Sequence, residues 1–314
     1  MPLDLGLASS HAPFMFSEAK DWDAMRRRLV REVPPPRELA GETLEVVEGY
    51  VARINAGFDN LRRRLVEYKP DALIIVGDDQ NEVFAPNNMP SIAIFTGEAA
   101  AGTRNIGLLG QPAEENHVHL KTHTVLARLL ANRLVERGFD LSLMDEFRAM
   151  YRPAGGLGHA FTRIAGIMDL ERLEIPVVLV FLNGYHAPMP TARRCFELGQ
   201  AIAEVLADRP ERVAIYGSGG LSHDPGGPRA GWIDEKLDRW VLSQIEAGRG
   251  EALTQLYTFD SDTFHGGTGE IRAWITAAGA FNGVPGHVVD YMASYMAVGG
   301  LGFAYWERAG VPVG

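Results

Sequence analysis

Short runs of apolar residues alternate along the chain with longer segments that mix apolar and polar residues at helical spacing. The apolar runs, such as ALIIV and VVLVFL, are closed by Gly, Asn or Asp, a pattern typical of strands buried in a sheet. The segments expected to form strands are Leu3–Ala8, Ala72–Val76, Ile92–Phe95, Val177–Leu182 and Val213–Tyr216.

Helical periodicity fills much of the chain between these runs. The segments expected to form helices are Glu38–Glu67 (with a candidate break near Gly57), Val118–Arg137, Ala192–Ala207, Ile233–Glu246 and Thr268–Ala280. Strands that alternate with helices predict an α/β fold. We expect a single layered αβα domain over residues 1–314, with a central mostly parallel or mixed sheet.

The segment Phe14–Pro36 interrupts this alternation. It contains charged residues, Trp22 and the triplet Pro34–Pro36, and it is long for a connection inside a compact domain. Long connections of this kind are usually lids or disordered segments. Because the segment directly follows His11, we expect it to be a lid insertion at residues 14–36.

The composition restricts the partners and the compartment. The 314 residues are 46% hydrophobic and 22% charged, as in a globular protein with a full core. The net charge is −10 and the basic residues form no concentrated patch, so no nucleic-acid partner is expected. A single cysteine, Cys195, excludes a disulfide framework and fits a reducing cytosol. With no signal-peptide pattern and no apolar stretch of the roughly 18 residues that span a bilayer, we expect a soluble cytoplasmic protein without a membrane partner.

Four polar loops follow predicted strands, and a further polar segment, Gly269–Glu270, lies near the start of the last predicted helix. Because open α/β sheets bind ligands beyond the carboxyl ends of their strands, we expect these segments to meet at one crevice. They are Ser9–Pro13, Gly77–Glu82, Gly155–His159, Gly217–Asp224 and Gly269–Glu270. Taken singly, each has a structural explanation, such as a tight glycine turn. The chain has neither a Walker ending nor GxGxxG after its first strand, so no nucleotide cofactor is expected.

The histidines of His117–His123 form another candidate for metal binding. In the predicted helix, His119 and His123 lie four residues apart and share a face. The zincin pattern needs Glu directly after the first histidine, whereas Leu120 stands there. We therefore interpret the segment as a polar helix start with one inward-facing histidine, outside the main site.

Four motifs, in order along the chain, resemble one known family. They are SSHAP at residues 9–13, FLNGYHAPMPTARRCFELG at 181–199, IYGSGGLSHDPGGPRAG at 215–231 and GTGEIRAW at 267–274. Together they resemble the class III extradiol ring-cleavage dioxygenases, the superfamily of the protocatechuate 4,5-dioxygenase β-subunit. The resemblance covers essentially the whole chain apart from Phe14–Pro36.

The resemblance implies roles for particular residues. His11 corresponds to the family's first metal ligand, and Glu270 corresponds to its carboxylate ligand. His223 corresponds to the acid/base histidine, and His159 to a histidine of the pocket near substrate or oxygen. Family members bind Fe(II) through two histidines and one carboxylate, which leaves positions open for substrate and dioxygen.

The second metal histidine of the family falls on Gln80, in VGDDQNEVF. A glutamine binds a metal through its amide oxygen, more weakly than imidazole does, so lower affinity for Fe(II) or another divalent metal is expected. Two other interpretations stay open. Asp79, Glu82 or a histidine of His117–His123 fills this position, or the metal site is lost. We favour a retained site because all the other matched residues are present.

The resemblance thus implies oxygen-dependent ring opening of a small catecholic or aminophenolic aromatic. The alternative is a non-catalytic or metal-deficient homologue that acts as a partner subunit or binds a small molecule. Hydrolysis at a zinc-like site is disfavoured, because such an open site usually has a stronger set of three ligands.

Substrate and partner expectations follow from the same resemblance. Tyr185 and His186 are expected to contact the substrate, and Arg152 and Arg163 are further candidates to meet a carboxylate. Some relatives need a small helical subunit that roofs the active site. Because this chain has no fused equivalent, we expect a homo-oligomer or a complex with such a subunit.

Overall fold

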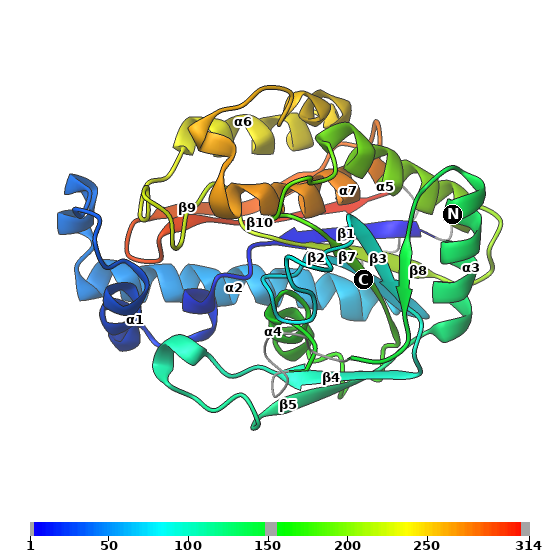
Figure 1. The fold of residues 1–314 in the computed structure, drawn as a ribbon, viewed down its shortest axis with the longest axis horizontal. Helices are drawn as coiled ribbons and strands as arrows, with labels where there is room; N and C mark the ends of the chain where they lie inside the picture. The colour runs from blue at the N-terminus through cyan, green and yellow to red at the C-terminus, as the bar shows by residue number, and fades with distance from the viewer. Residues whose placement is uncertain (1–2, 148–155, 309–314) are drawn as a thin grey trace.

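A mixed sheet of eight strands runs through the centre of the computed structural model, which describes residues 3–147 and 156–308 (Figure 1). Its middle consists of parallel strands, in the order β7 (Val177–Leu182), β2 (Ala72–Asp78), β8 (Val213–Ser218) and β1 (Leu3–Ser9). Beyond β7 lie β3 (Ile92–Phe95) and β6 (Ser142–Met144), and beyond β1 lie β10 (Gly299–Glu307) and β9 (His287–Ser294). On each side of the four central strands, the next strand is antiparallel: β3 runs antiparallel to β7, and β10 runs antiparallel to β1.

Helices cover both faces of this sheet (Figure 1). One face carries α3 (Thr124–Glu136), α5 (Ala192–Leu206), α6 (Glu235–Glu246) and α7 (Ile271–Ala280), and the other carries α2 (Leu44–Tyr68) and α4 (His159–Ile167). The side chains between sheet and helices form two hydrophobic clusters, one for each face. The predicted layered α/β fold with a mixed sheet is confirmed. Among the described residues, no helix has the length and apolar content that a membrane span requires.

All five predicted strands are present, and three of them extend beyond their apolar runs. Strand β1 continues to Ser9, β2 to Asp78 and β8 to Ser218, and every residue of β2 and β8 is buried. The polar residues at these strand ends are therefore held by the sheet. The strands β6, β9 and β10 and the hairpin of β4 (Ala99–Thr103) and β5 (His117–Lys121) were not predicted.

The helix predicted over Val118–Arg137 begins later than expected. His117–Lys121 forms strand β5, whose alternate side chains are buried, and α3 starts only at Thr124. The prediction that His119 and His123 share a helix face is therefore wrong. The segment pairs with β4 in an antiparallel hairpin. Its side chains alternate in burial, which is the period-two pattern of a half-buried strand.

Helix α2 runs unbroken through Gly57, so the candidate break there is wrong. A Cβ added at Gly57 would lie 2.8 Å from the ring of Phe303 on β10. The glycine therefore permits close approach of the helix to the sheet.

The segment Phe14–Pro36 is folded against the rest of the chain. It contains helix α1 (Trp22–Leu29) and two short 3-10 turns. Phe14, Trp22 and Met25 are buried in the hydrophobic cluster that includes α2. Phe14 and Leu29 also line a cavity of about 560 Å³, which we call the main cavity, so the segment forms part of its wall. Its opening as a lid stays a prediction.

Candidate metal centre

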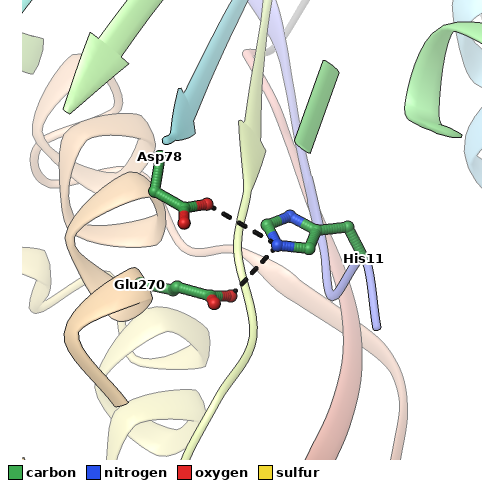
Figure 2. Close-up of side chains that lie close together, drawn as sticks. All are labelled: His11, Asp78 and Glu270. Atoms are coloured by element: carbon green, nitrogen blue, oxygen red, sulfur yellow. Dashed lines mark ion pairs between the residues drawn. The ribbon is translucent and has the colours of Figure 1, made fainter. Parts of the chain in front are cut away.

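Three buried side chains meet beyond the carboxyl ends of the central strands. His11 follows β1, Asp78 is the last residue of β2, and Glu270 directly precedes α7 (Figure 2). The Nε2 atom of His11 lies 3.2 Å from Oε2 of Glu270 and 3.6 Å from Oδ1 of Asp78. Ligand atoms of all three residues lie within 4.8 Å of one another. One imidazole and two carboxylates at this spacing form a candidate site for a divalent cation. We call His11, Asp78 and Glu270 the metal group.

The orientation of the His11 ring is set by hydrogen bonds on the side away from the carboxylates. Ser218 Oγ donates to the carbonyl oxygen of Ala160 at 2.6 Å. The same Oγ lies 2.9 Å from His11 Nδ1, so it accepts the proton of Nδ1. In the neutral ring, Nε2 then presents a lone pair to the two carboxylates, as a metal ligand would.

Several polar atoms of this group lack hydrogen-bond partners. Within the described part of the chain, His11 Nε2 and both Asp78 oxygens are buried and unpaired. Burial, reinforced by the charge of Glu270, raises the pKa of Asp78 well above its usual range. A buried lone pair that faces carboxylates is unfavourable unless a proton or a metal cation lies between them. The donor set therefore fits a divalent ion, whose charge two carboxylates would balance.

Glu270 is held by donors from three other segments. Its Oε1 accepts hydrogen bonds from Tyr185 Oη at 2.5 Å and from Gln80 Nε2 at 2.9 Å. Its Oε2, the oxygen nearest His11, accepts the backbone N–H of Gly220 at 2.5 Å. These contacts fix the carboxylate, as outer hydrogen bonds do for metal ligands in general.

Glu270 is ionised despite its burial. Burial alone raises the pKa of this carboxyl, but the imidazoles of His223 and His11 outweigh it and hold the pKa well below the usual range. The carboxylate form is the one that binds a metal.

Gln80 points toward the centre but contacts it as a donor, through its amide nitrogen. Asp79 and Glu82, considered as replacements, are engaged elsewhere. Asp79 accepts the backbone N–H groups of the loop after β2, and Glu82 binds His159. The histidines of His117–His123 are not part of the group. The carboxylate beside His11 and Glu270 comes from the residue that ends β2.

Sequence reasoning missed Asp78 because two adjacent aspartates follow the same apolar run. The signal lay in the strand length. If β2 continues for two residues past Val76, Asp78 occupies its buried carboxyl end and Asp79 begins the loop. An aspartate inside a buried strand needs a partner, and among the described residues neither oxygen of Asp78 has a hydrogen bond, with His11 Nε2 3.6 Å away.

His223 lies beside the metal group with a defined tautomer. Its Nδ1 lies 2.8 Å from the carbonyl oxygen of Leu221 and donates to it, while Nε2 lies 3.3 Å from Glu270 Oε1. Burial lowers the pKa of His223, but the charge of Glu270 outweighs burial and raises it. Nε2 is therefore the atom that gains and loses a proton.

Glycines make room for the His223 ring. A Cβ at Gly220 would lie 2.5 Å from its Cε1 atom, and a Cβ at Gly267 would overlap Nε2 itself. The glycine-rich turn before His223 and the glycines before Glu270 thus form a slot that any side chain would fill.

His159 lies beside His11, at the first turn of α4. The two rings meet edge to face with centroids 4.9 Å apart. His159 Nδ1 and its backbone N–H both bind Glu82. Burial lowers the pKa of His159 despite this carboxylate. Burial also acts to raise the pKa of Glu82, but His159 outweighs it and lowers that pKa to about 2.

The metal group opens into the main cavity of about 560 Å³. His11, Glu270, His223, His159 and Tyr185 all line it. His186 does not. It lines a neighbouring cavity of about 330 Å³, which also borders Gln80 and Tyr185. Arg152 lies outside the described residues.

Comparison with known families decides the class of protein. The family described as the catalytic LigB subunit of aromatic ring-opening dioxygenase matches residues 38–304. The chain belongs to this family. The resemblance drawn from its motifs is confirmed, and Asp78, Gln80, His223 and Glu270 all fall inside the matched region.

Curated relatives of this LigB-family chain are named 2,3-dihydroxyphenylpropionate/2,3-dihydroxicinnamic acid 1,2-dioxygenase. One from Photorhabdus laumondii is 27% identical over 65% of this chain and 58% of the relative. Another, from Klebsiella pneumoniae, is 30% identical over 59% of this chain and 53% of the relative. The chain thus spans less than two thirds of the length of these relatives.

The fold also has a counterpart among solved structures. An uncharacterized protein of Escherichia coli K12, JW3007, matches with a TM-score of 0.53 and 14% identity, over 96% of this chain and 99% of that one. At this identity the likeness concerns the fold alone.

Proposed function

We propose that this LigB-family chain opens the ring of a small catecholic or aminophenolic aromatic with O2, using Fe(II) held by His11, Asp78 and Glu270. The observation that supports this most is the buried group of unpaired ligand atoms at the floor of an aromatic-sized cavity. The curated relatives are named for dihydroxylated aromatic acids, which supports a substrate of this class.

Asp78 replaces Gln80 in the ligand set that the sequence suggested. Gln80 instead orients Glu270, together with Tyr185. Two carboxylates and one imidazole are harder ligands than the family's two imidazoles and one carboxylate. Manganese should therefore compete with iron better here than at the usual set.

A bound ferrous ion would supply Lewis acidity toward the substrate's oxygens and the one-electron chemistry that ground-state dioxygen needs. The protein supplies the proton transfer. His223 Nε2 accepts a phenolic proton, because Nδ1 is already committed to Leu221. Burial lowers the pKa of His159, which favours its neutral form, and His159 lines the same cavity beside His11, where it would contact the aromatic or dioxygen.

Oxygen uptake tests the proposal. The chain is reconstituted anaerobically with Fe(II) and mixed with catechols, gallates and aminophenols. At least one class should consume one O2 per substrate, and a chelator should abolish this until Fe(II) is returned. Iron near one per chain with no uptake would reject the reaction. Absence of metal binding would favour the alternative, a metal-deficient binding homologue.

The assembly is proposed from the resemblance alone. We expect the chain to form a homo-oligomer or to bind a small helical subunit over the cavity. Native mass spectrometry of the chain in cell extract and after purification distinguishes these forms from a monomer.

A further inference from the structure

Arg163 lies one helical turn after His159 on α4. Residues four apart share a helix face, and both side chains line the main cavity. The Nη1 atom of Arg163 donates a hydrogen bond to the carbonyl oxygen of His11 at 3.2 Å. The guanidinium is thereby tied to the main chain of a metal-group residue.

This guanidinium is buried, and the carboxylates of Glu82 and Glu270 act on it without direct contact. Arg163 is only 9% exposed, and its Nε is buried without a hydrogen-bond partner. Within residues 3–147 and 156–308 it forms no ion pair, since both oxygens of the nearby Glu82 engage His159. Burial lowers the pKa of Arg163 to about 10, so the group stays charged at neutral pH.

Lysine and arginine side chains are scarce among the described residues that line the cavity. Of the described residues that line it, Arg163 is the single lysine or arginine. The lining carboxylates are Glu82 and Glu270, both already engaged. Much of the remaining wall is apolar, with Leu29, Ile106, Leu108, Val298 and Leu301. Glu82 and Glu270 act on the guanidinium only from a distance, so an anion in direct contact with it would further offset the cost of burying the charge.

We infer that Arg163 binds an anionic substituent, a carboxylate, on the molecule that occupies this cavity. The planar guanidinium suits a carboxylate through charge-assisted hydrogen bonds, and the Arg163 side chain lines the cavity. Since the guanidinium is tied to His11, the anion subsite keeps a fixed place relative to the metal group. The inference rests on the proposed function only in taking that molecule to be the substrate. Arg163 would then determine specificity.

The test uses two ligands that differ in charge and cannot be turned over. Phenylpropionate and phenylpropanol are titrated calorimetrically into the full chain under anaerobic conditions. The acid should bind at least about 10-fold more tightly, since a hydrogen bond to a charged group contributes roughly this much. Equal affinity, or no measurable binding of the acid, overturns the inference without any variant being needed.

Variants then assign the preference to Arg163. Arg163→Met should weaken the acid roughly 10- to 100-fold and the alcohol less than about 3-fold, with Arg163→Lys in between. Arg26→Met is the matched control, because Arg26 is also buried with an unpaired nitrogen but does not line the cavity. Equal weakening of both ligands by Arg163→Met would reveal a structural role and overturn the inference.

Neither titration depends on turnover, so the two proposals fail separately. An acid preference that needs Arg163, without oxygen uptake on any aromatic, would leave the subsite standing and reject the dioxygenase reaction. The opposite result is oxygen consumption with kcat/KM values that are equal for catechols with and without a carboxylate, both in wild type and in Arg163→Met. That result would support the dioxygenase reaction and reject the anion subsite.

Discussion

The two oxygens of Glu270 have different neighbours, and this division organises the site at the scale of residues. Oε1 accepts from Tyr185 and Gln80 and lies near His223, whereas Oε2 faces His11. Because Oε1 already accepts two hydrogen bonds, Oε2 is the oxygen that would bind a metal beside His11. Under the proposed function, Gln80 acts on the metal through Glu270, which would explain how glutamine can stand where the resemblance places a histidine.

His223 should be the acid/base group at this scale. We expect His223→Ala to lower kcat by roughly 10²–10⁴, the usual contribution of one such group, with iron content unchanged. Single-turnover kinetics and metal analysis of the same sample measure both. Turnover within tenfold of wild type would show that another group moves the proton.

The glycine slot gives a sharper test of the same ring. A Cβ at Gly267 would overlap His223 Nε2, whereas one at Gly226 would meet nothing within 4 Å. We expect Gly267→Ala to lower kcat at least about tenfold, since misplacement of a reacting group by about an ångström costs up to 10²-fold. Gly226→Ala should leave kcat unchanged. Equal rates for the two variants would mean that the ring position is not critical.

At the scale of elements, hydrophobic periodicity predicted the buried central strands, but it did not predict the end of β2 or strand β5. Continuous apolar runs located the buried parallel strands and the polar loops after them, including that of His11, whereas Glu270 was found near the start of a predicted helix. The strand end at Asp78 was missed because a buried carboxylate looks like loop sequence. Strand β5 was read as helix because five residues of alternating pattern preceded a true helix at Thr124.

Helix α2 allows a matched test of packing against the sheet. A Cβ at Gly57 would lie 2.8 Å from Phe303, whereas one at Gly49 would meet nothing within 4 Å. We expect Gly57→Ala to lower the free energy of unfolding by roughly 1–3 kcal/mol through overpacking. Gly49→Ala should raise it by about 0.5–1 kcal/mol through helix propensity. Urea unfolding measures both, and stabilisation by Gly57→Ala would contradict the close contact.

The segment Phe14–Pro36 is the element expected to move. Its buried Phe14 and Trp22 anchor it, while Leu29 reaches the cavity wall. If it serves as a lid, amide exchange in residues 14–36 should slow several-fold when a substrate analogue binds, because closure protects the backbone. Peptides from α5, away from the cavity, provide the control. Unchanged exchange in both regions would rule out the lid.

At the scale of the whole molecule, the sheet brings together residues that are far apart in the chain. Strands β1, β2 and β8 are neighbours, so their carboxyl ends place His11, Asp78 and Ser218 side by side, and α7 adds Glu270. Which strands are neighbours is a property of the topology, and local sequence patterns do not reveal it. The family resemblance indicated His11 and Glu270 as candidate ligands, and the fold added Asp78 as a third candidate.

The most direct test of this account is anaerobic titration of Fe(II) into wild type, Asp78→Asn and Gln80→Ala. Asp78→Asn should lose stoichiometric iron, because it removes a ligand charge. Its metal-free form should be at least as stable as wild type, since an unpaired buried carboxylate is gone. Gln80→Ala should keep iron with affinity reduced roughly 10- to 100-fold, the usual effect of losing an outer hydrogen bond. Iron retained by Asp78→Asn and lost by Gln80→Ala would contradict the proposed centre.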